Sequence, residues 1–257
     1  MKTGIFDKKV APNKHLVQDL MYASASTHFP SGTDGVILLG QRPELAIKRA
    51  MSNVIKNKVL HGFDIKTEAV RSATYVKHKH EYKNLKIHLG NVADAPCVNF
   101  QDIDFCGPFV TDRRNMSPQL ENGTLDGYAE LAENDSLNIL MNRLCTMKKL
   151  NGYKVLFSTV MNARANYGKR FSFIALDSLL YEIGYSLVDI DGLTYDIGQG
   201  DKISTTGCKH ENGSVFHAYK HTVRVKKVKQ NTVEFCKFDV YTYTDTTPML
   251  TFSLVFK

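Results

Sequence analysis

Short apolar runs alternate with longer amphipathic stretches from Gly35 onward. Each short run is bounded by glycine, asparagine or an acidic residue, a pattern that predicts buried strands. The predicted strands cover 36–39, 59–63, 85–89, 98–105 and 153–160. Apolar residues at helical spacing predict helices over 43–56, 67–76, 136–150 and 171–183. Alternation of strand and helix is typical of consecutive βαβ units and hence of a largely parallel sheet.

Both ends of the chain depart from this alternation. Near the N-terminus, residues 14–25 predict a helix with Leu16, Leu20 and Met21 covering one face. Beyond Tyr185 the helical period disappears and strand-like alternation takes over. The strands predicted there cover 215–228, 232–243 and 249–256, with a hairpin turn at Gln230–Asn231.

We therefore expect an α/β fold whose sheet is mostly parallel and ends in antiparallel C-terminal strands, the last of them free to insert beside its neighbours. The expected organisation is a single domain over residues 1–257, with an N-terminal helical extension over 1–34 and the antiparallel strands within 185–257. The polar, turn-rich segment 111–135 is long for a connection, which predicts a functional loop or lid.

Composition narrows the class of protein. The 257 residues are 43% hydrophobic and 23% charged, as in soluble globular proteins. No apolar run is long enough to cross a bilayer and the polar start lacks a signal-peptide core, so we expect a cytoplasmic protein. Five scattered cysteines without a CxxC pair predict neither disulfides nor a zinc site. The net charge of +7 favours a polyanionic partner but also occurs in ordinary enzymes.

Candidate ligand residues follow the predicted strands, because open parallel sheets bind ligands outside the carboxyl ends of their strands. Gly40 lets a cofactor approach the backbone, and Asp64 is placed to accept hydrogen bonds from two ribose hydroxyls. The GxGxxG motif that cradles a pyrophosphate is absent, which argues against NAD and FAD. S-adenosylmethionine, a cationic sulfonium nucleoside, needs no phosphate cradle and is the predicted cofactor.

At these positions the chain resembles the class I S-adenosylmethionine-dependent methyltransferases, over most of residues 30–257. The segment VILLGQRPE stands in the place of the family's first motif, and Asp64 matches the acid of its second. The resemblance implies that Asn91 or Asp94, after the third strand, holds the adenine edge. It also implies a three-layer, Rossmann-like methyltransferase sheet.

The segment QDIDFCGP is similar to the Asp-X-Asp-Pro-X-Gly motif of tRNA guanine-N2 methyltransferases, with Phe105 replacing proline. Asp104 or Asp102 would accept a hydrogen bond from an exocyclic amine, and Phe105 would stack on the target base. Bacteriophage methyltransferase-like proteins carry a similar Asp-X-Asp-Phe-Cys signature and an Arg-containing turn after the fifth strand. Arg164 lies in the corresponding turn here, and we expect it to contact nucleic acid.

A second basic stretch, VRVKKVK, falls in a predicted strand. Alternation places Thr222, Arg224 and Lys226 on one face and Val223 and Val225 on the other. Arg224 and Lys226 could then follow a phosphate backbone. Lysines also protect the exposed edges of sheets, and the sequence leaves both interpretations open.

Simpler interpretations exist for the other candidates. Asp64 could serve only as a helix cap, and Cys106 beside Asp104 is more typical of inert packing than of a nucleophile. His78 and His80 lie in a charged helix end, where solvation explains them better than metal binding.

Three functions remain open on this basis. The leading one is a methyltransferase, viral in origin, acting on a nucleic-acid base amine. The second is a non-catalytic protein of the same fold that binds nucleic acid or a viral or host protein in a replication or transcription complex. The third is an enzyme that uses the same cofactor, or another nucleoside, for a different reaction.

Overall fold

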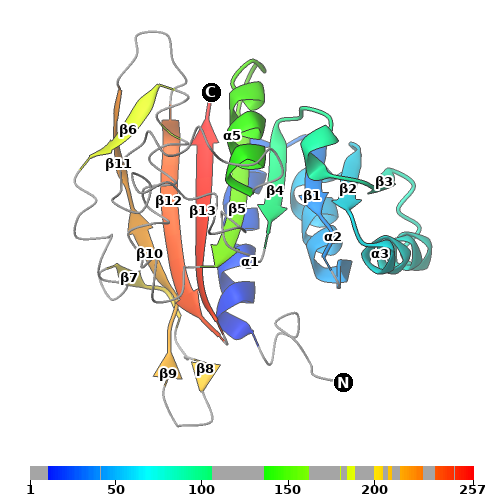
Figure 1. Cartoon of the computed structure of the whole chain (residues 1–257), viewed down its shortest axis with the longest axis horizontal. Helices are drawn as coiled ribbons and strands as arrows, with labels where there is room; N and C mark the ends of the chain where they lie inside the picture. The colour runs from blue at the N-terminus through cyan, green and yellow to red at the C-terminus, as the bar shows by residue number, and fades with distance from the viewer. Residues whose placement is uncertain are drawn as a thin grey trace, which may run out of the picture.

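The computed structural model describes most of the sheet and the helices that cover it (Figure 1). The described residues are 11–40, 42–105, 136–161, 180, 184–188, 200–204, 208–209, 215–227, 235–245 and 247–257. The predicted loop 111–135, the turn at Gln230–Asn231 and nearly all of the predicted helix 171–183 lie outside them.

A nine-stranded sheet in the order β3-β2-β1-β4-β5-β13-β12-β10-β7 forms the centre of the molecule. The five leading strands are β1 (Gly35–Leu38), β2 (Leu60–Asp64), β3 (Leu85–Leu89), β4 (Phe100–Asp104) and β5 (Lys154–Met161), all parallel. The strands that complete it are β7 (Asp201–Lys202), β10 (Tyr219–Thr222), β12 (Phe235–Thr244) and β13 (Pro248–Phe256). β13 runs antiparallel to both β5 and β12 and lies between them. The structure thus confirms the predicted fold class, a mostly parallel, Rossmann-like α/β sheet with antiparallel C-terminal strands.

Helices cover both faces of this sheet. The described helical segments are α1 (Pro12–His28), α2 (Glu44–Ala50), η1 (Met51–Ile55), α3 (Thr67–Lys79), η2 (Val92–Asp94) and α5 (Ser136–Met147). Apolar residues of α1, α2 and α3 pack in one core cluster with Ile37, Phe100 and Phe157 of the sheet. Those of α5 pack in a second cluster with Ile103 and Leu156. Alternate residues of β4 therefore face α1 on one side and α5 on the other.

The predicted C-terminal strand 215–228 is interrupted in the structure. It divides into β9 (Val215–Phe216), β10 and β11 (Arg224–Lys227), because the chain leaves the main sheet after β10 and β11 pairs with β6 (Tyr185–Val188). β9 pairs instead with β8 (Cys208–Lys209). None of the described helices is long and apolar enough to cross a membrane.

The prediction for the buried face of α1 is wrong in part. Met21 is buried as expected, but Leu20 is 41% exposed. The helix instead buries the polar side chains of its first turn: Asn13, Lys14 and His15. These side chains are tolerated inside because each has polar partners. Asn13 Nδ2 donates to the backbone oxygens of Phe216 and Thr244, Lys14 pairs with Asp104, and His15 contacts Arg49.

Asp245, in the turn between β12 and β13, anchors the beginning of α1. Its two carboxylate oxygens accept hydrogen bonds from the backbone N–H groups of Asn13 at 3.0 Å and Lys14 at 2.8 Å. No side chain of α1 itself caps this end, so a carboxylate more than 230 residues away takes the place of a local cap.

We expect Asp245→Ala to destabilise the protein by about 2 kcal/mol, because two buried N–H groups lose their acceptor. Urea unfolding near neutral pH measures the change. Asp201→Ala is the matched control, since Asp201 is exposed on the outer strand β7. Equal stability of the two variants would show that Asp245 does not anchor the helix.

Candidate functional site

Gly40 and Asp64 meet at the carboxyl ends of β1 and β2, as the sequence predicts. The Gly40 N–H donates to Asp64 Oδ2 at 3.0 Å, and the Lys66 N–H donates to Oδ1 at 2.8 Å. Gly40 has a φ of +62°, a conformation that favours glycine. Because each carboxylate oxygen accepts two hydrogen bonds, both oxygens of Asp64 can also accept from ribose hydroxyls.

Asn91 and Asp94 lie in the turn after β3, next to this pair. The Gly90 N–H donates to the backbone oxygen of Asp64 at 3.0 Å, which fixes the turn against β2. Asn91 caps the short helix η2, its Oδ1 accepting from the Ala93 N–H at 2.9 Å. Asp94 is exposed at the end of η2. The side chain of Asn91 is therefore fixed by the turn itself, whereas that of Asp94 is open to solvent.

Two exposed apolar side chains at the same edge were not predicted from the sequence. Ile65 directly follows Asp64 and is 72% exposed, and Leu89, which pairs with Asp64 across the strands, is 59% exposed. Large apolar side chains left open beside polar hydrogen-bonding groups suit a flat heterocycle. An apolar residue immediately after a strand-ending acid was the available signal.

Asp102 is buried beneath α1. Its Oδ2 accepts a hydrogen bond of 2.6 Å from the hydroxyl of Tyr22, and its side chain lies in the face that α1 covers. Burial is the main cause that raises the pKa of Asp102 to about 7, and the nearby carboxylate of Asp104 raises it further, against the opposing hydrogen bond from Tyr22. Near neutral pH this carboxyl group is thus available in its protonated form.

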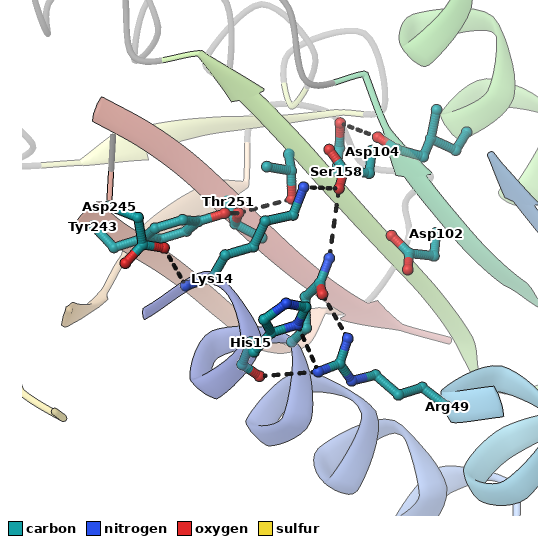
Figure 2. A network of polar contacts seen from close by, with 12 residues as sticks. Lys14, His15, Arg49, Asp102, Asp104, Ser158, Tyr243, Asp245 and Thr251 are labelled. Carbon is teal, nitrogen blue, oxygen red and sulfur yellow. Dashed lines mark hydrogen bonds and ion pairs between the residues drawn. The ribbon is translucent and has the colours of Figure 1, made fainter. Parts of the chain in front are cut away.

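Asp104 lies two residues after Asp102, at the end of β4, and its side chain is on the same face of the sheet (Figure 2). Its Oδ2 is 2.8 Å from Lys14 Nζ and accepts a longer hydrogen bond of 3.5 Å from Gln18 Nε2. Since Ile37 pairs with Asp102, the parallel register places Leu39 beside Asp104, one residue before Gly40. The structure thus brings Asp104 close to the Gly40 turn.

The donors on α1 were missed by the sequence analysis. Lys14, Gln18 and Tyr22 are spaced four residues apart and therefore lie on one face of the helix, above Asp104 and Asp102. Arg49 of α2 also contacts α1, donating to Asp19 at 2.5 Å and to Gln18 Oε1 at 2.8 Å.

The remaining predicted residues are placed as follows. Phe105 is partly buried against the core cluster on the α5 side of the sheet, not on the α1 side with Asp104. Arg224 and Lys226 are exposed while Val223 is buried, so the predicted alternation holds. Arg164 and Cys106 lie outside the described residues.

The histidines of the charged helix end do not form a metal cluster. His80 contacts Glu44 Oε1 at 3.1 Å, while His78 is exposed. Within the part of the chain that the structure describes, no group of three or more His, Cys, Asp and Glu side chains could hold a metal ion.

No family model and no curated protein matches this chain. Among solved structures it is similar to M. jannaschii TYW2 in complex with AdoMet, with 10% identity, 99% of this chain and 78% of the other covered, and a TM-score of 0.47. An rRNA methylase from Streptococcus thermophilus is 10% identical, with 94% of this chain and 95% of the other covered and a TM-score of 0.41. Precorrin-6y C5,15-methyltransferase from Geobacter metallireducens is 8% identical, with 93% of this chain and 86% of the other covered and a TM-score of 0.46. At such identities and TM-scores, the reaction of this chain has to be argued from its own residues.

Proposed function

We propose that this chain is an S-adenosylmethionine-dependent methyltransferase whose acceptor is the exocyclic amine of a nucleic-acid base. The observation that carries the proposal is the meeting of Asp64 with Gly40 at the ends of β2 and β1. Asn91 and Asp104 continue the same edge on the neighbouring strands β3 and β4. This is the edge where open parallel sheets bind nucleotides.

Each residue of the edge has a role that its geometry supports. S-adenosylmethionine, when bound, supplies a methyl group on a positively charged sulfur. Asp64 would accept the two ribose hydroxyls, and Asn91 would orient the adenine edge between Ile65 and Leu89. Asp104 would hold an N–H of the acceptor amine, align its lone pair with the methyl group and take the proton that the nitrogen loses.

The nucleic-acid part of the proposal is supported by charge. The chain carries a net charge of +7, and Arg224 and Lys226 present cationic groups on the exposed side of β11. Such groups bind phosphates independently of sequence. The phage resemblance and the stacking role of Phe105 stay predictions.

Calorimetric titration with S-adenosylhomocysteine tests the cofactor site, and we expect saturable binding to the unmodified chain. Absence of both heat and a thermal shift, with either the cofactor or its demethylated product, would remove the methyltransferase proposal.

Asp64→Ala should weaken this binding by about 100-fold, because two hydrogen bonds to a charged acceptor are lost. Asp34→Ala is the matched control. Asp34 accepts the Val59 N–H at 2.8 Å at the amino end of β1, so its loss also removes a backbone contact, but at the opposite edge. Equal affinities of the two variants would exclude Asp64 as a ribose ligand.

A non-catalytic protein that binds nucleic acid is the second candidate. This candidate is favoured because the carboxylates of the site already have partners within the protein. Asp64 accepts hydrogen bonds from two backbone N–H groups, and Asp104 is paired with Lys14. Salt-sensitive RNA or DNA binding without any affinity for S-adenosylhomocysteine would support this candidate over the first.

A further inference from the structure

Two histidines on the outer strands of the sheet hold each other in place. Nδ1 of His61, on β2, lies 3.1 Å from Nε2 of His88, on β3. The two ring planes are 14° apart and the ring centroids 5.3 Å apart, so the rings are nearly parallel and meet through their ring nitrogens. An N–H···N hydrogen bond needs one proton and one lone pair, and each imidazole therefore fixes the orientation of the other.

Phe63 supports this pair on the side of the core. The rings of Phe63 and His88 are 11° apart with their centroids at 4.4 Å, which is a stacked arrangement. Phe63 is only 5% exposed, whereas His88 is partly exposed. The stack thus begins in the core and ends at His88. Among the described residues, no further aromatic ring stacks on His88.

The chain between β3 and β4 leaves this part of the sheet open. Its helix η2 is only three residues long, and Val92 of η2 packs in the same core cluster as Val36 of β1. β3 is the outermost strand on this side of the sheet (Figure 1). The two histidines lie beside the covered part of this face and remain partly exposed.

A cation lies next to the stack. Lys86 is exposed, pairs with His61 across the strands and precedes His88 by two residues on the same face of β3. Burial lowers the pKa of His88, and the charge of Lys86 lowers it further. Burial, His88 and Lys86 also lower the pKa of His61, against the opposing charge of Asp34. At about pH 7.5 the site therefore presents neutral rings beside a solvated ammonium group.

We propose that Phe63, His88 and Lys86 form a docking site for single-stranded nucleic acid, in which a base stacks on His88 and a neighbouring phosphate pairs with Lys86. An aromatic side chain of a protein would fit the ring alone, but the lysine and the net charge of +7 favour a polyanion. The inference rests on the nucleic-acid part of the proposed function. It adds a contact for the strand on the opposite face of the sheet from Asp104.

The ring is tested with two labelled strands of equal length, an oligoadenylate and a strand without bases, titrated by fluorescence anisotropy in the absence of cofactor. We expect the unmodified chain to bind the oligoadenylate at least 10-fold more tightly. His88→Leu still covers Phe63 but has no flat face, so it should lower this ratio about 10-fold. His88→Phe keeps a ring and should keep the ratio, as should His78→Leu, a change at an exposed histidine of α3.

The cation is tested by the salt dependence of the same binding. Lys86→Met should weaken the binding of both strands and lower the slope of log affinity against log salt by about 0.7, as expected for one lost phosphate contact. His88→Leu should leave this slope unchanged. Lys202→Met is the matched control, because Lys202 is exposed on β7 at the opposite edge of the sheet, and it should change neither quantity.

Each result decides one part of the inference. An unchanged ratio in His88→Leu overturns the stacking role, and an unchanged slope in Lys86→Met overturns the phosphate contact. Equal binding of the two strands by the unmodified chain, or binding of neither, overturns the docking site as a whole, and this comparison stands even where a variant does not fold. Because no cofactor is present, such a failure leaves the S-adenosylhomocysteine test of the methyltransferase proposal untouched.

Discussion

Asp102→Asn should remove much of the pH dependence of folding stability above about pH 5. Burial raises the pKa of Asp102 from 3.8 to about 7, so the folded chain binds a proton there that the unfolded chain releases. Over that interval the folded state holds more protons than the unfolded state, and stability falls as pH rises.

The direction and size of this pH dependence follow from the two pKa values of Asp102, 3.8 and about 7. The stabilisation from this proton is fully present below about pH 4 and is lost as pH rises through 7. Raising the pH from about 5 to about 8.5 should lower the free energy of unfolding of the unmodified chain by about 3 kcal/mol through the ionisation of this group. Asparagine cannot ionise, so the variant should not show this loss, whatever its stability at a single pH.

Urea unfolding at several pH values measures the difference between the two chains, which cancels the contribution of other titrating groups. Asp201→Asn, which removes an exposed carboxylate on β7, should follow the unmodified chain at every pH. A pH-independent difference between Asp102→Asn and the unmodified chain would show that Asp102 does not take up a proton on folding.

This protonation also bears on the proposed chemistry. Asp102 and Asp104 are two residues apart on one strand face, where two negative charges repel each other. A protonated Asp102, bonded by Tyr22, relieves that repulsion near neutral pH. The pair would thus separate into a buried neutral acid and the carboxylate that meets the acceptor.

The sequence predicts the parallel half of the fold and the ends of its strands well. β3 spans the predicted 85–89, and Gly40, Asp64, Asn91 and Asp104 all follow or end their strands as expected. These features are local: a short apolar run, its period and the residue that ends it are all contained in a few neighbouring positions.

The polar contacts that complete the site are not local, and the sequence does not predict them. Lys14 meets Asp104 across 90 positions, and Asp245 meets Lys14 across 231. A lysine in the first turn of a helix is normally exposed, so its burial depends on partners that only the folded sheet supplies. The interruption of strand 215–228 has the same origin, since β6 competes for its second half.

Arg143→Met should destabilise the protein by about 3 kcal/mol and also weaken S-adenosylhomocysteine binding. Arg143 of α5 is buried and donates to Gln101 Oε1 at 2.8 Å, to the backbone oxygen of Pro96 at 2.6 Å and to that of Ala95. Burial lowers the pKa of the guanidinium, and the three acceptors offset part of the free-energy cost of holding its charge inside the protein. Methionine fills the volume but leaves all three acceptors without their donor.

The effect on binding follows from where those acceptors lie. Ala95 and Pro96 connect η2, which Asn91 caps, to β4, so Arg143 fixes the predicted adenine-binding turn from the far face of the sheet. Once the turn loosens, its ordering costs free energy on each binding event, and we expect about a 10-fold loss of affinity.

Unfolding curves and calorimetric titrations of three variants separate these effects. Arg143→Lys keeps the charge but not the planar set of donors. Its stability and its affinity for S-adenosylhomocysteine should therefore lie between those of Arg143→Met and those of the unmodified chain. Arg71→Met removes an exposed arginine from α3 and should change neither quantity. If Arg143→Met lost stability but bound S-adenosylhomocysteine normally, the turn after β3 would hold its shape without α5, and Arg143 would serve only the core.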